Sequence, residues 1–182
     1  MNNKVLYESI LSAISKEIKK VLYEAKTDNF NNGEAYRFLK IYVAKVIIMT
    51  LGEKNAKLDN STDSVKMKLK IGKTTKDVHL SMCYNDKNEV AVSQSKMMWM
   101  KNIAFISDNK IYIVNGDLLR ANWGNEDVCR IDRSVYFDRL KESSKMTRFN
   151  LDFLKTNASD IISLTEEAAE KYQTSYNEMN LK

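Results

Sequence analysis

The clearest pattern of hydrophobic and polar positions lies between residues 76 and 123. In the segment AFISDNKIYIV, apolar side chains alternate with others on both sides of the pair Asp108 and Asn109. A short polar pair between two alternating runs is typical of a β-hairpin. The pattern therefore predicts strands over residues 103–107 and 110–114, joined by a tight turn.

The flanks of this hairpin predict four more elements. The runs 78–83 and 90–92 have the apolar character of strands, and Ser93 is suited to cap a helix over residues 93–101. A second capped helical turn is predicted over residues 115–123. The helix 93–101 is rich in methionine, which has two interpretations: these side chains fill the core, or they form an adaptable binding surface.

Two helices are predicted before this stretch, over residues 4–26 and 34–51. In the first, apolar side chains recur at spacings of three and four residues, which places them on one helix face. Lysines occupy much of the first helix's remaining surface, so this helix either packs on the core with a solvated basic face or lies along phosphates. The second helix is apolar around more of its circumference, which favours a central position.

Residues 64–71, SVKMKLKI, alternate strictly between apolar and lysine side chains after Ser64. This period of two predicts a half-buried strand with one apolar face and one lysine face, preceded by a polar surface loop over residues 53–63. Further lysines follow in the turn at residues 72–76. The densest positive patch of the chain is therefore Lys66, Lys68, Lys70, Lys73 and Lys76.

Two roles remain open for these five lysines. Lysines on an edge strand protect it against pairing with other chains. They also form a contact row for nucleic-acid phosphates or for the acidic side chains of a partner. The second role makes the five lysines the candidate binding residues.

The C-terminal third predicts four short elements. These are a strand over residues 128–131, a helical turn over 134–141, a strand over 149–154 and a helix over 159–174, with a tail that frays after the helix.

The predicted elements amount to a mixed α+β fold, in which a small central mixed sheet is flanked by helices. A chain of 182 residues with no proline and five glycines favours one compact domain over residues 1–182. Its parts are an N-terminal helical pair (4–51), a core of sheet and helices (64–123) and a C-terminal strand and helix (128–174).

The composition and charge of the chain indicate which class of partner it suits. The chain is 43% hydrophobic and 29% charged, with a net charge of +5 and a pI of about 9.0. It contains no apolar run of the ~18 residues that span a bilayer, and its N-terminus lacks a signal-peptide pattern. We therefore expect a cytoplasmic protein without a membrane partner. The modest positive charge suits an anionic partner, such as nucleic acid or an acidic protein surface.

Few residues are available for catalysis by side chains. His79 is the only histidine, and Cys83 and Cys129 have no nearby cysteine partner, so buried free thiols are predicted. The sequence lacks the glycine-rich phosphate loops and the common nucleophile and zinc motifs. It predicts no cofactor, no metal and no small-molecule substrate.

The order of elements resembles the small phage- and plasmid-borne nucleases of the PD-(D/E)xK superfamily. The similar part is residues 75–120. There TTKDVHLS resembles the family's Thr-Gly-Asn strand, SQSKMMWMKNIAFISDNKIYIV its Ser-Lys helix and hairpin, and DLLR its closing Leu-Arg helix. The resemblance covers about a quarter of the chain. It implies a restriction-endonuclease-like fold around the central sheet.

The sequence departs from this family where the metal ligands belong. Those nucleases hold a divalent cation with an aspartate and with a Glu or Asp two residues before a lysine, because Mg²⁺ prefers oxygen ligands. If residues 65–71 form the motif strand, Lys70 is the motif lysine, but Lys68 stands in place of the carboxylate, and the later acid falls on Ser81. A lysine there places a positive charge where the cation must sit.

A second alignment does not restore the metal site. If residues 78–83 form the motif strand, its positions are His79, Ser81 and Cys83. A migrated site remains open, because four acidic residues are near in sequence: Asp59, Asp63, Asp77 and Glu89.

Three functions follow from this resemblance and this departure. The first is a non-catalytic protein of mobile-element origin that binds nucleic-acid machinery. Small, basic, single-domain chains rich in Lys and Asn are similar to phage anti-CRISPR proteins. This makes a Cas9-type effector, DNA or guide RNA, alone or in combination, the expected partner. The second is an active Mg²⁺-dependent endonuclease or junction resolvase with a rearranged site. The third is a DNA-binding regulator.

Overall fold

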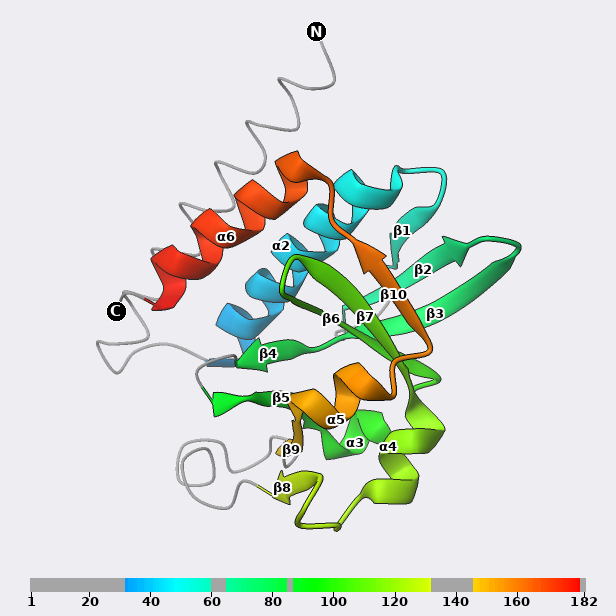
Figure 1. Cartoon of the computed structure of the whole chain (residues 1–182), viewed down its shortest axis with the longest axis vertical. Coiled ribbons are helices and arrows are strands. Elements are labelled where there is room, and N and C mark those ends of the chain that lie inside the picture. The colour runs from blue at the N-terminus through cyan, green and yellow to red at the C-terminus, as the bar shows by residue number, and fades with distance from the viewer. Residues whose placement is uncertain (1–31, 60–64, 85–86, 132–145, 181–182) are drawn as a thin grey trace, which may run out of the picture.

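The computed structural model describes residues 32–59, 65–84, 87–131 and 146–180 of the chain (Figure 1). The predicted helices over 4–26 and 134–141 lie outside these residues. The described elements, in chain order, are α2 (Asn32–Leu51), β1 (Ala56–Asp59), β2 (Lys66–Ile71), β3 (Thr74–Leu80), β4 (Met82–Tyr84), β5 (Glu89–Ser93), α3 (Gln94–Met97), β6 (Asn102–Ser107), β7 (Lys110–Asn115), α4 (Gly116–Asn122), β8 (Cys129–Ile131), β9 (Met146–Asn150), α5 (Leu151–Thr156), β10 (Asp160–Ser163) and α6 (Glu166–Asn180).

The central element is a six-stranded sheet with the strand order β1-β2-β3-β6-β7-β10. Strands β3 and β6 pair in parallel, whereas every other pair in this sheet is antiparallel. A mixed sheet with helices packed on it confirms the predicted mixed α+β fold.

A smaller sheet, with the order β4-β5-β9-β8, adjoins the large one. The chain passes from the large sheet to the small one at Ser81, whose backbone N–H donates to the carbonyl of Ala104 at 3.0 Å. The predicted single strand over residues 78–83 is therefore wrong in one respect. The segment forms the end of β3 and the start of β4, which belong to different sheets and are separated by Ser81.

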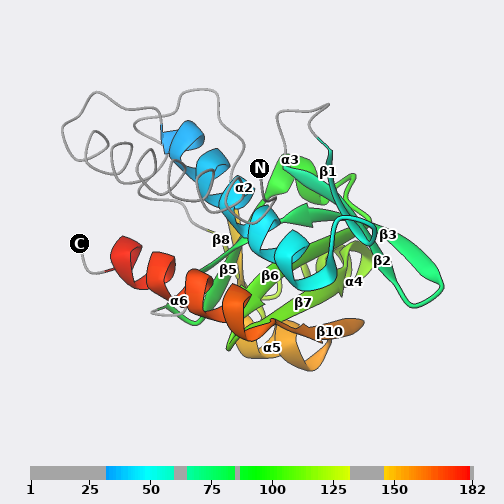
Figure 2. The same cartoon turned by 90° about the horizontal axis from the view of Figure 1, so that it is seen from above.

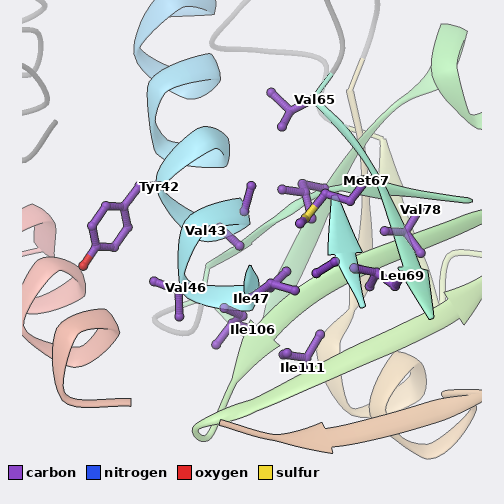
Figure 3. Packing of buried hydrophobic residues seen from close by; sticks show 14 of the residues in the cluster. Tyr42, Val43, Val46, Ile47, Val65, Met67, Leu69, Val78, Ile106 and Ile111 are labelled. Carbon is purple, nitrogen blue, oxygen red and sulfur yellow. The ribbon is translucent and has the colours of Figure 1, made fainter. Parts of the chain in front are cut away.

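One face of the large sheet is covered by α2 and α6, which lie side by side in both views (Figures 1 and 2). Met67, Leu69 and Val78 of the sheet pack there with Val43 and Ile47 of α2 (Figure 3). Two tyrosine hydroxyls fix α6 in place, since Tyr42 donates to the carbonyl of Lys171 at 2.7 Å and Tyr172 to that of Ile106 at 3.2 Å. The second helix is as central as its apolar pattern predicts.

Within the described residues, the second core cluster covers the other face of the large sheet over β6 and β7. Phe105 and Tyr112, which stack with ring centroids 5.4 Å apart, belong to a second core cluster. This cluster also contains buried residues of the small sheet, of α4 and of α5, including Val90, Leu119 and Leu154. Because β6 and β7 are buried on both faces, their side chains are almost all apolar.

The predicted hairpin and the predicted capped turn after it are confirmed. Asp108 and Asn109 both have positive φ, at 50° and 55°, which is the geometry of a two-residue hairpin turn whose twist matches that of the strands. Asn115 caps α4 by accepting a hydrogen bond from the backbone N–H of Asp117 at 2.7 Å.

Within the predicted loop 53–63, Ala56–Asp59 forms strand β1 instead. The segment pairs with β2, with the buried Ala56 opposite Leu69. Pairing with β2 supplies hydrogen-bond partners for the backbone along one edge of this short segment. The composition of the segment does not indicate this pairing.

The predicted helix 93–101 is shorter than expected, since α3 ends at Met97. The Arg120 guanidinium donates to the carbonyls of Met97 and Met100 at 2.8 and 2.9 Å. The Arg120 side chain of α4 thus supplies hydrogen bonds to carbonyls at and just after the end of α3. The chain then continues into β6.

Two predictions for the C-terminal part are wrong. The strand expected over 149–154 is the end of β9 followed by helix α5, which begins where Asn150 accepts a hydrogen bond from Phe153 N at 3.0 Å. The helix expected over 159–174 is strand β10 followed by α6, and α6 continues to Asn180 instead of ending near residue 174. In β10 the run of isoleucines pairs with β7, and this tertiary pairing outweighs the helical pattern.

Candidate functional site

A polar surface lies on β1, β2 and β3, on the side of the large sheet opposite α2. Residues directly opposite each other in antiparallel strands share one face. Lys68 of β2 faces Lys57 of β1 and Asp77 of β3, and Lys66 faces Asp59 and His79. We call this surface the lysine face, and it comprises Lys57, Asp59, Lys66, Lys68, Lys70, Thr75, Asp77 and His79.

Side chains of the lysine face project away from the hydrophobic core. Lys57, Lys68 and Lys70 are exposed, and Lys66 is half-buried. Among the described residues, no buried side chain of β1, β2 or β3 belongs to the second core cluster, which covers this side of the sheet over β6 and β7. Figure 1 accordingly shows β2 and β3 extending away from α4 and α5. Within the described part of the chain, the side chains of Lys57, Lys68 and Lys70 are thus accessible to a ligand.

The structure divides the five lysines that the sequence predicts as binding residues. Lys66, Lys68 and Lys70 lie together on the lysine face. Lys73 is exposed in the turn between β2 and β3, beside Gly72, whose φ of 60° makes the tight turn possible. Lys76 lies opposite Leu69, on the helix-covered side of the sheet, and does not join the other four.

Lys76 instead has a structural contact. Its ammonium forms a salt bridge with Asp160 of β10 and donates to Ser159 Oγ at 3.2 Å. Burial alone would raise the pKa of Asp160, but hydrogen bonds from Lys76 and Ser159 outweigh it and lower this pKa below the ordinary value of 3.8. Lys76 therefore connects β3 to β10 across the end of the sheet.

Replacing Lys76 with glutamine should destabilise the protein by about 1 kcal/mol at neutral pH. Because the folded-state pKa of Asp160 is lowered, this stabilisation is present above pH ~4 and is lost as the pH falls through the lowered pKa. Chemical denaturation of the wild type and of Lys76→Gln at pH 7 and pH 3 measures the difference. Lys73→Gln, which removes an exposed lysine of the same strand pair, is the matched control and should change stability by less than ~0.5 kcal/mol. A difference between the wild type and Lys76→Gln that is as large at pH 3 as at pH 7 contradicts the assigned pair.

Lys57 is a member of the lysine face that the sequence pattern does not reveal as a site residue. It lies in β1, within the segment predicted to be a loop, and faces Lys68 across the strand pair. The only signal in the sequence is the alternation of AKLD, in which Ala56 and Leu58 are the inward positions. Four lysines at the face outnumber its two aspartates, so its electrostatic potential is positive.

The lysines of β2 form a regularly spaced row. Alternate residues of a strand lie about 6.8 Å apart, because each residue rises ~3.4 Å. Lys66, Lys68 and Lys70 therefore place three ammonium groups along one line, and nucleic acid carries a negative charge on every phosphate. The arrangement is suited to several simultaneous phosphate contacts.

His79 lies at the inner end of the lysine face. Burial, together with the charges of Lys66, Lys96 and Lys40, lowers its pKa from 6.5 to about 4, although the charge of Asp77 acts in the opposite direction. The imidazole is therefore neutral at pH 7 and adds no positive charge to the face.

The acidic residues considered above as ligands of a migrated metal site do not lie together among the described residues. Asp59 and Asp77 lie on the lysine face, beside Lys66 and Lys68. Glu89 lies in β5, where it pairs with Arg148 at 3.4 Å and Arg130 at 3.9 Å. Asp63 lies outside the described residues. In the part of the chain that the structure describes, no three His, Cys, Asp or Glu side chains come together as a metal site would require.

The predicted thiols are confirmed, since Cys83 and Cys129 are both buried and form no disulfide with each other. The methionine-rich segment is divided between the core and the surface. Met97 and Met100 are buried in the second core cluster, whereas Trp99 is 86% exposed next to the exposed Met98.

Comparisons of the chain with known proteins gave no match to a protein-family model, to a curated protein or to a solved structure. Within the described residues, no helix is long and apolar enough to cross a membrane.

Proposed function

We propose that the protein is a non-catalytic binding protein that acts on nucleic-acid machinery and contacts nucleic-acid phosphates through its lysine face. The observation that carries this proposal is the open side of β1, β2 and β3, where Lys57, Lys66, Lys68 and Lys70 are gathered by strand pairing. Ammonium groups of this kind neutralise phosphates and release the counterions bound to them, which supplies most of the sequence-independent affinity for nucleic acid.

The chemistry at Lys68 favours binding over cleavage. In the nuclease superfamily that the sequence resembles, a carboxylate at this position would hold a divalent cation. Here an exposed lysine occupies it, with Lys57 directly opposite on β1. Two positive charges within a strand pair repel a cation but attract a phosphate.

A Cas9-type effector is the partner that we propose. The support is the resemblance of this small, basic chain to phage anti-CRISPR proteins. Such effectors bind a guide–target heteroduplex and a displaced single strand through the sugar–phosphate backbones of these nucleic acids. A basic face that contacts the same phosphates would hold effector and nucleic acid together in an unproductive complex.

Direct regulation of DNA is the second candidate, and the exposure of the lysine face is the observation that favours it. Lys68 and Lys70 are accessible on the isolated chain, so phosphate contact does not require an effector. The two candidates differ in one measurable respect. A DNA-binding regulator binds duplex DNA alone, whereas an effector inhibitor reduces target cleavage at concentrations that leave free DNA unbound.

A cleavage assay with a Cas9-type effector, its guide RNA and a plasmid target tests the proposal. We expect added protein to reduce cleavage in proportion to its concentration, and we expect a gel shift of the effector–nucleic acid complex. The same plasmid with Mg²⁺ or Mn²⁺ and no effector tests the nuclease alternative. Nicking that is lost in Asp77→Asn would contradict the non-catalytic proposal. Absence of both inhibition and nucleic-acid binding would contradict the binding proposal altogether.

A further inference from the structure

Large apolar side chains are exposed around the turn between α3 and β6. Trp99 is 86% exposed and its neighbour Met98 53%, and Trp123, the residue after α4, is 39% exposed. Helix α4 packs directly against the turn, since a Cβ added at Gly116 would lie 2.3 Å from the carbonyl oxygen of Met100. Large apolar side chains that are exposed in one region mark a binding surface, whereas single ones need no explanation.

Contacts on both sides of Trp99 fix the backbone of this turn. Met97 and Met100 are buried in the second core cluster. The backbone N–H groups of Trp99 and Met100 both donate to the carbonyl of Lys96, at 3.0 and 2.9 Å. The Arg120 guanidinium donates to the carbonyls of Met97 and Met100. Trp99 is therefore held out on a preorganised backbone, so little backbone freedom is lost when a ligand contacts its ring.

A hydrogen bond connects this turn to the lysine face. The side chain of Asn102, the first residue of β6, donates to the backbone carbonyl of Asp77 at 3.0 Å. Trp99 precedes Asn102 by three residues. Because consecutive Cα atoms are about 3.8 Å apart, the Cα atoms of Trp99 and Asn102 are separated by at most ~11 Å.

A small pocket at the inner end of the lysine face connects the two regions a second time. Its lining includes Lys40, His79, Lys96 and Met100. His79 belongs to the lysine face, and Met100 directly follows Trp99 in the chain. The exposed tryptophan is therefore a close neighbour of the lysine face.

The local charge distinguishes Trp99 from Trp123. Trp123 is followed by the exposed acidic residues Glu126 and Asp127, whose charges repel phosphates. Trp99 is followed by the exposed Lys101 and is the more exposed of the two tryptophans. Of the two rings, Trp99 is thus the one suited to a ligand that carries phosphates.

A single-stranded nucleic acid is the ligand that uses both features. Proteins that bind single strands combine positive charge along the backbone with aromatic side chains on which bases stack. Here Lys57, Lys68 and Lys70 are exposed on the lysine face, beside Trp99. The bases of a duplex stack on one another, whereas an unpaired base offers its face to an external ring.

We infer that Trp99 stacks on an unpaired base of a single-stranded nucleic acid whose backbone lies along the lysine face. The inference rests on the proposed function, because it names single strands as the nucleic acid that the lysine face binds. Every base has a face that stacks, so the contact tolerates any base sequence. In a complex with a Cas9-type effector, the displaced strand is a ligand of this kind.

The fluorescence of Trp99 reports directly on this contact. The chain has two tryptophans, so Trp123→Phe leaves Trp99 alone and Trp99→Phe leaves Trp123 alone. We expect oligothymidylate to quench the Trp123→Phe protein with a saturable dependence on concentration and to leave the Trp99→Phe protein nearly unquenched. A duplex of the same length, added at equal phosphate concentration, should quench neither protein.

Replacing Trp99 with leucine should weaken binding to oligothymidylate by about 10-fold, because leucine is apolar but offers no ring for stacking. Trp99→Phe keeps a ring and should lose less than ~3-fold. Met98→Leu is the matched control for an exposed neighbour and should bind as the wild type does. Fluorescence anisotropy with labelled single strand and labelled duplex measures the affinities, and the duplex affinity should be the same in all three variants. Urea denaturation should show wild-type stability for Trp99→Leu, since the side chain is exposed.

Undiminished binding of oligothymidylate by Trp99→Leu, equal quenching of the two single-tryptophan proteins, or equal quenching by the duplex would overturn the inference. In each case the proposed function survives if replacing Lys68 and Lys70 still weakens binding. If Trp99→Leu binds oligothymidylate normally but no longer inhibits the effector, the turn contacts the effector protein, and stacking on a base is excluded. If neither single strand nor duplex binds, the inference and nucleic-acid binding by the lysine face fail together.

Discussion

Replacing Lys68 and Lys70 together with glutamine should weaken binding to nucleic acid by about 10- to 100-fold at physiological salt. Both side chains are exposed on the lysine face and alternate along β2, so they are suited to contact phosphates of one strand. The loss should be similar for oligonucleotides of different sequence, because phosphate contacts carry no base information. Fluorescence anisotropy with a labelled oligonucleotide, or with the effector–guide complex, measures the affinity.

A variant with the same loss of charge elsewhere isolates the role of the lysine face. Lys110 is exposed at the start of β7, and Lys171 lies on α6, on the covered side of the large sheet, where it pairs with Glu167 at 3.5 Å. The variant Lys110→Gln/Lys171→Gln should lose less than ~3-fold in affinity, as expected for a general change of net charge. Equal losses in the two double variants would mean that overall charge, and not the lysine face, determines binding.

Replacing Phe105 with alanine should lower the free energy of unfolding by about 3–5 kcal/mol. Phe105 has no exposed surface and stacks on Tyr112 at 5.4 Å between the centre of the large sheet and the small one. Truncation leaves a cavity in the second core cluster and removes the stacking contact. Urea denaturation followed by circular dichroism measures the change.

An exposed aromatic residue supplies the control for Phe105→Ala. Trp99 is 86% exposed, so Trp99→Ala should change stability by less than ~0.5 kcal/mol. If Phe105→Ala costs less than ~1 kcal/mol, the two sheets do not share the packed cluster described here. The Lys68→Gln/Lys70→Gln variant should retain wild-type stability in the same experiment, which ensures that its binding defect is not caused by unfolding.

Elements whose signals are local could be predicted from the sequence. Helix α2 has a strong apolar pattern, β2 alternates strictly, and the hairpin of β6 and β7 has a polar pair whose residues tolerate positive φ. Elements that depend on distant partners could not. Strand β1 is a short polar segment that exists because β2 pairs with it, and β10 is an isoleucine-containing segment that exists because β7 pairs with it.

The candidate site was predictable to the same extent. The alternation of residues along β2 is sufficient to place Lys66, Lys68 and Lys70 on one face. It does not reveal that Lys57 joins them, because this depends on the register between β1 and β2. Nor does it reveal that Lys76 belongs to the other side, where it meets Asp160 from a segment distant in sequence.

The pocket beside His79 depends on tertiary structure alone. Lys40, His79 and Lys96 are far apart in the chain and line one small pocket. In the sequence, His79 is notable only as the single histidine, and Lys40 is one lysine in an apolar helix. The sequence pattern does not indicate that these two residues line the same pocket.

The salt dependence of nucleic-acid binding tests most directly whether the lysine face contacts phosphates. Each phosphate neutralised contributes about 0.9 to the slope of log K against log salt concentration for duplex DNA. The slope for Lys68→Gln/Lys70→Gln should therefore be smaller than that of the wild type by about 2, whereas Lys110→Gln/Lys171→Gln should keep the wild-type slope. A wild-type slope in the Lys68→Gln/Lys70→Gln variant would show that these lysines release no counterions, and would contradict phosphate binding by this face.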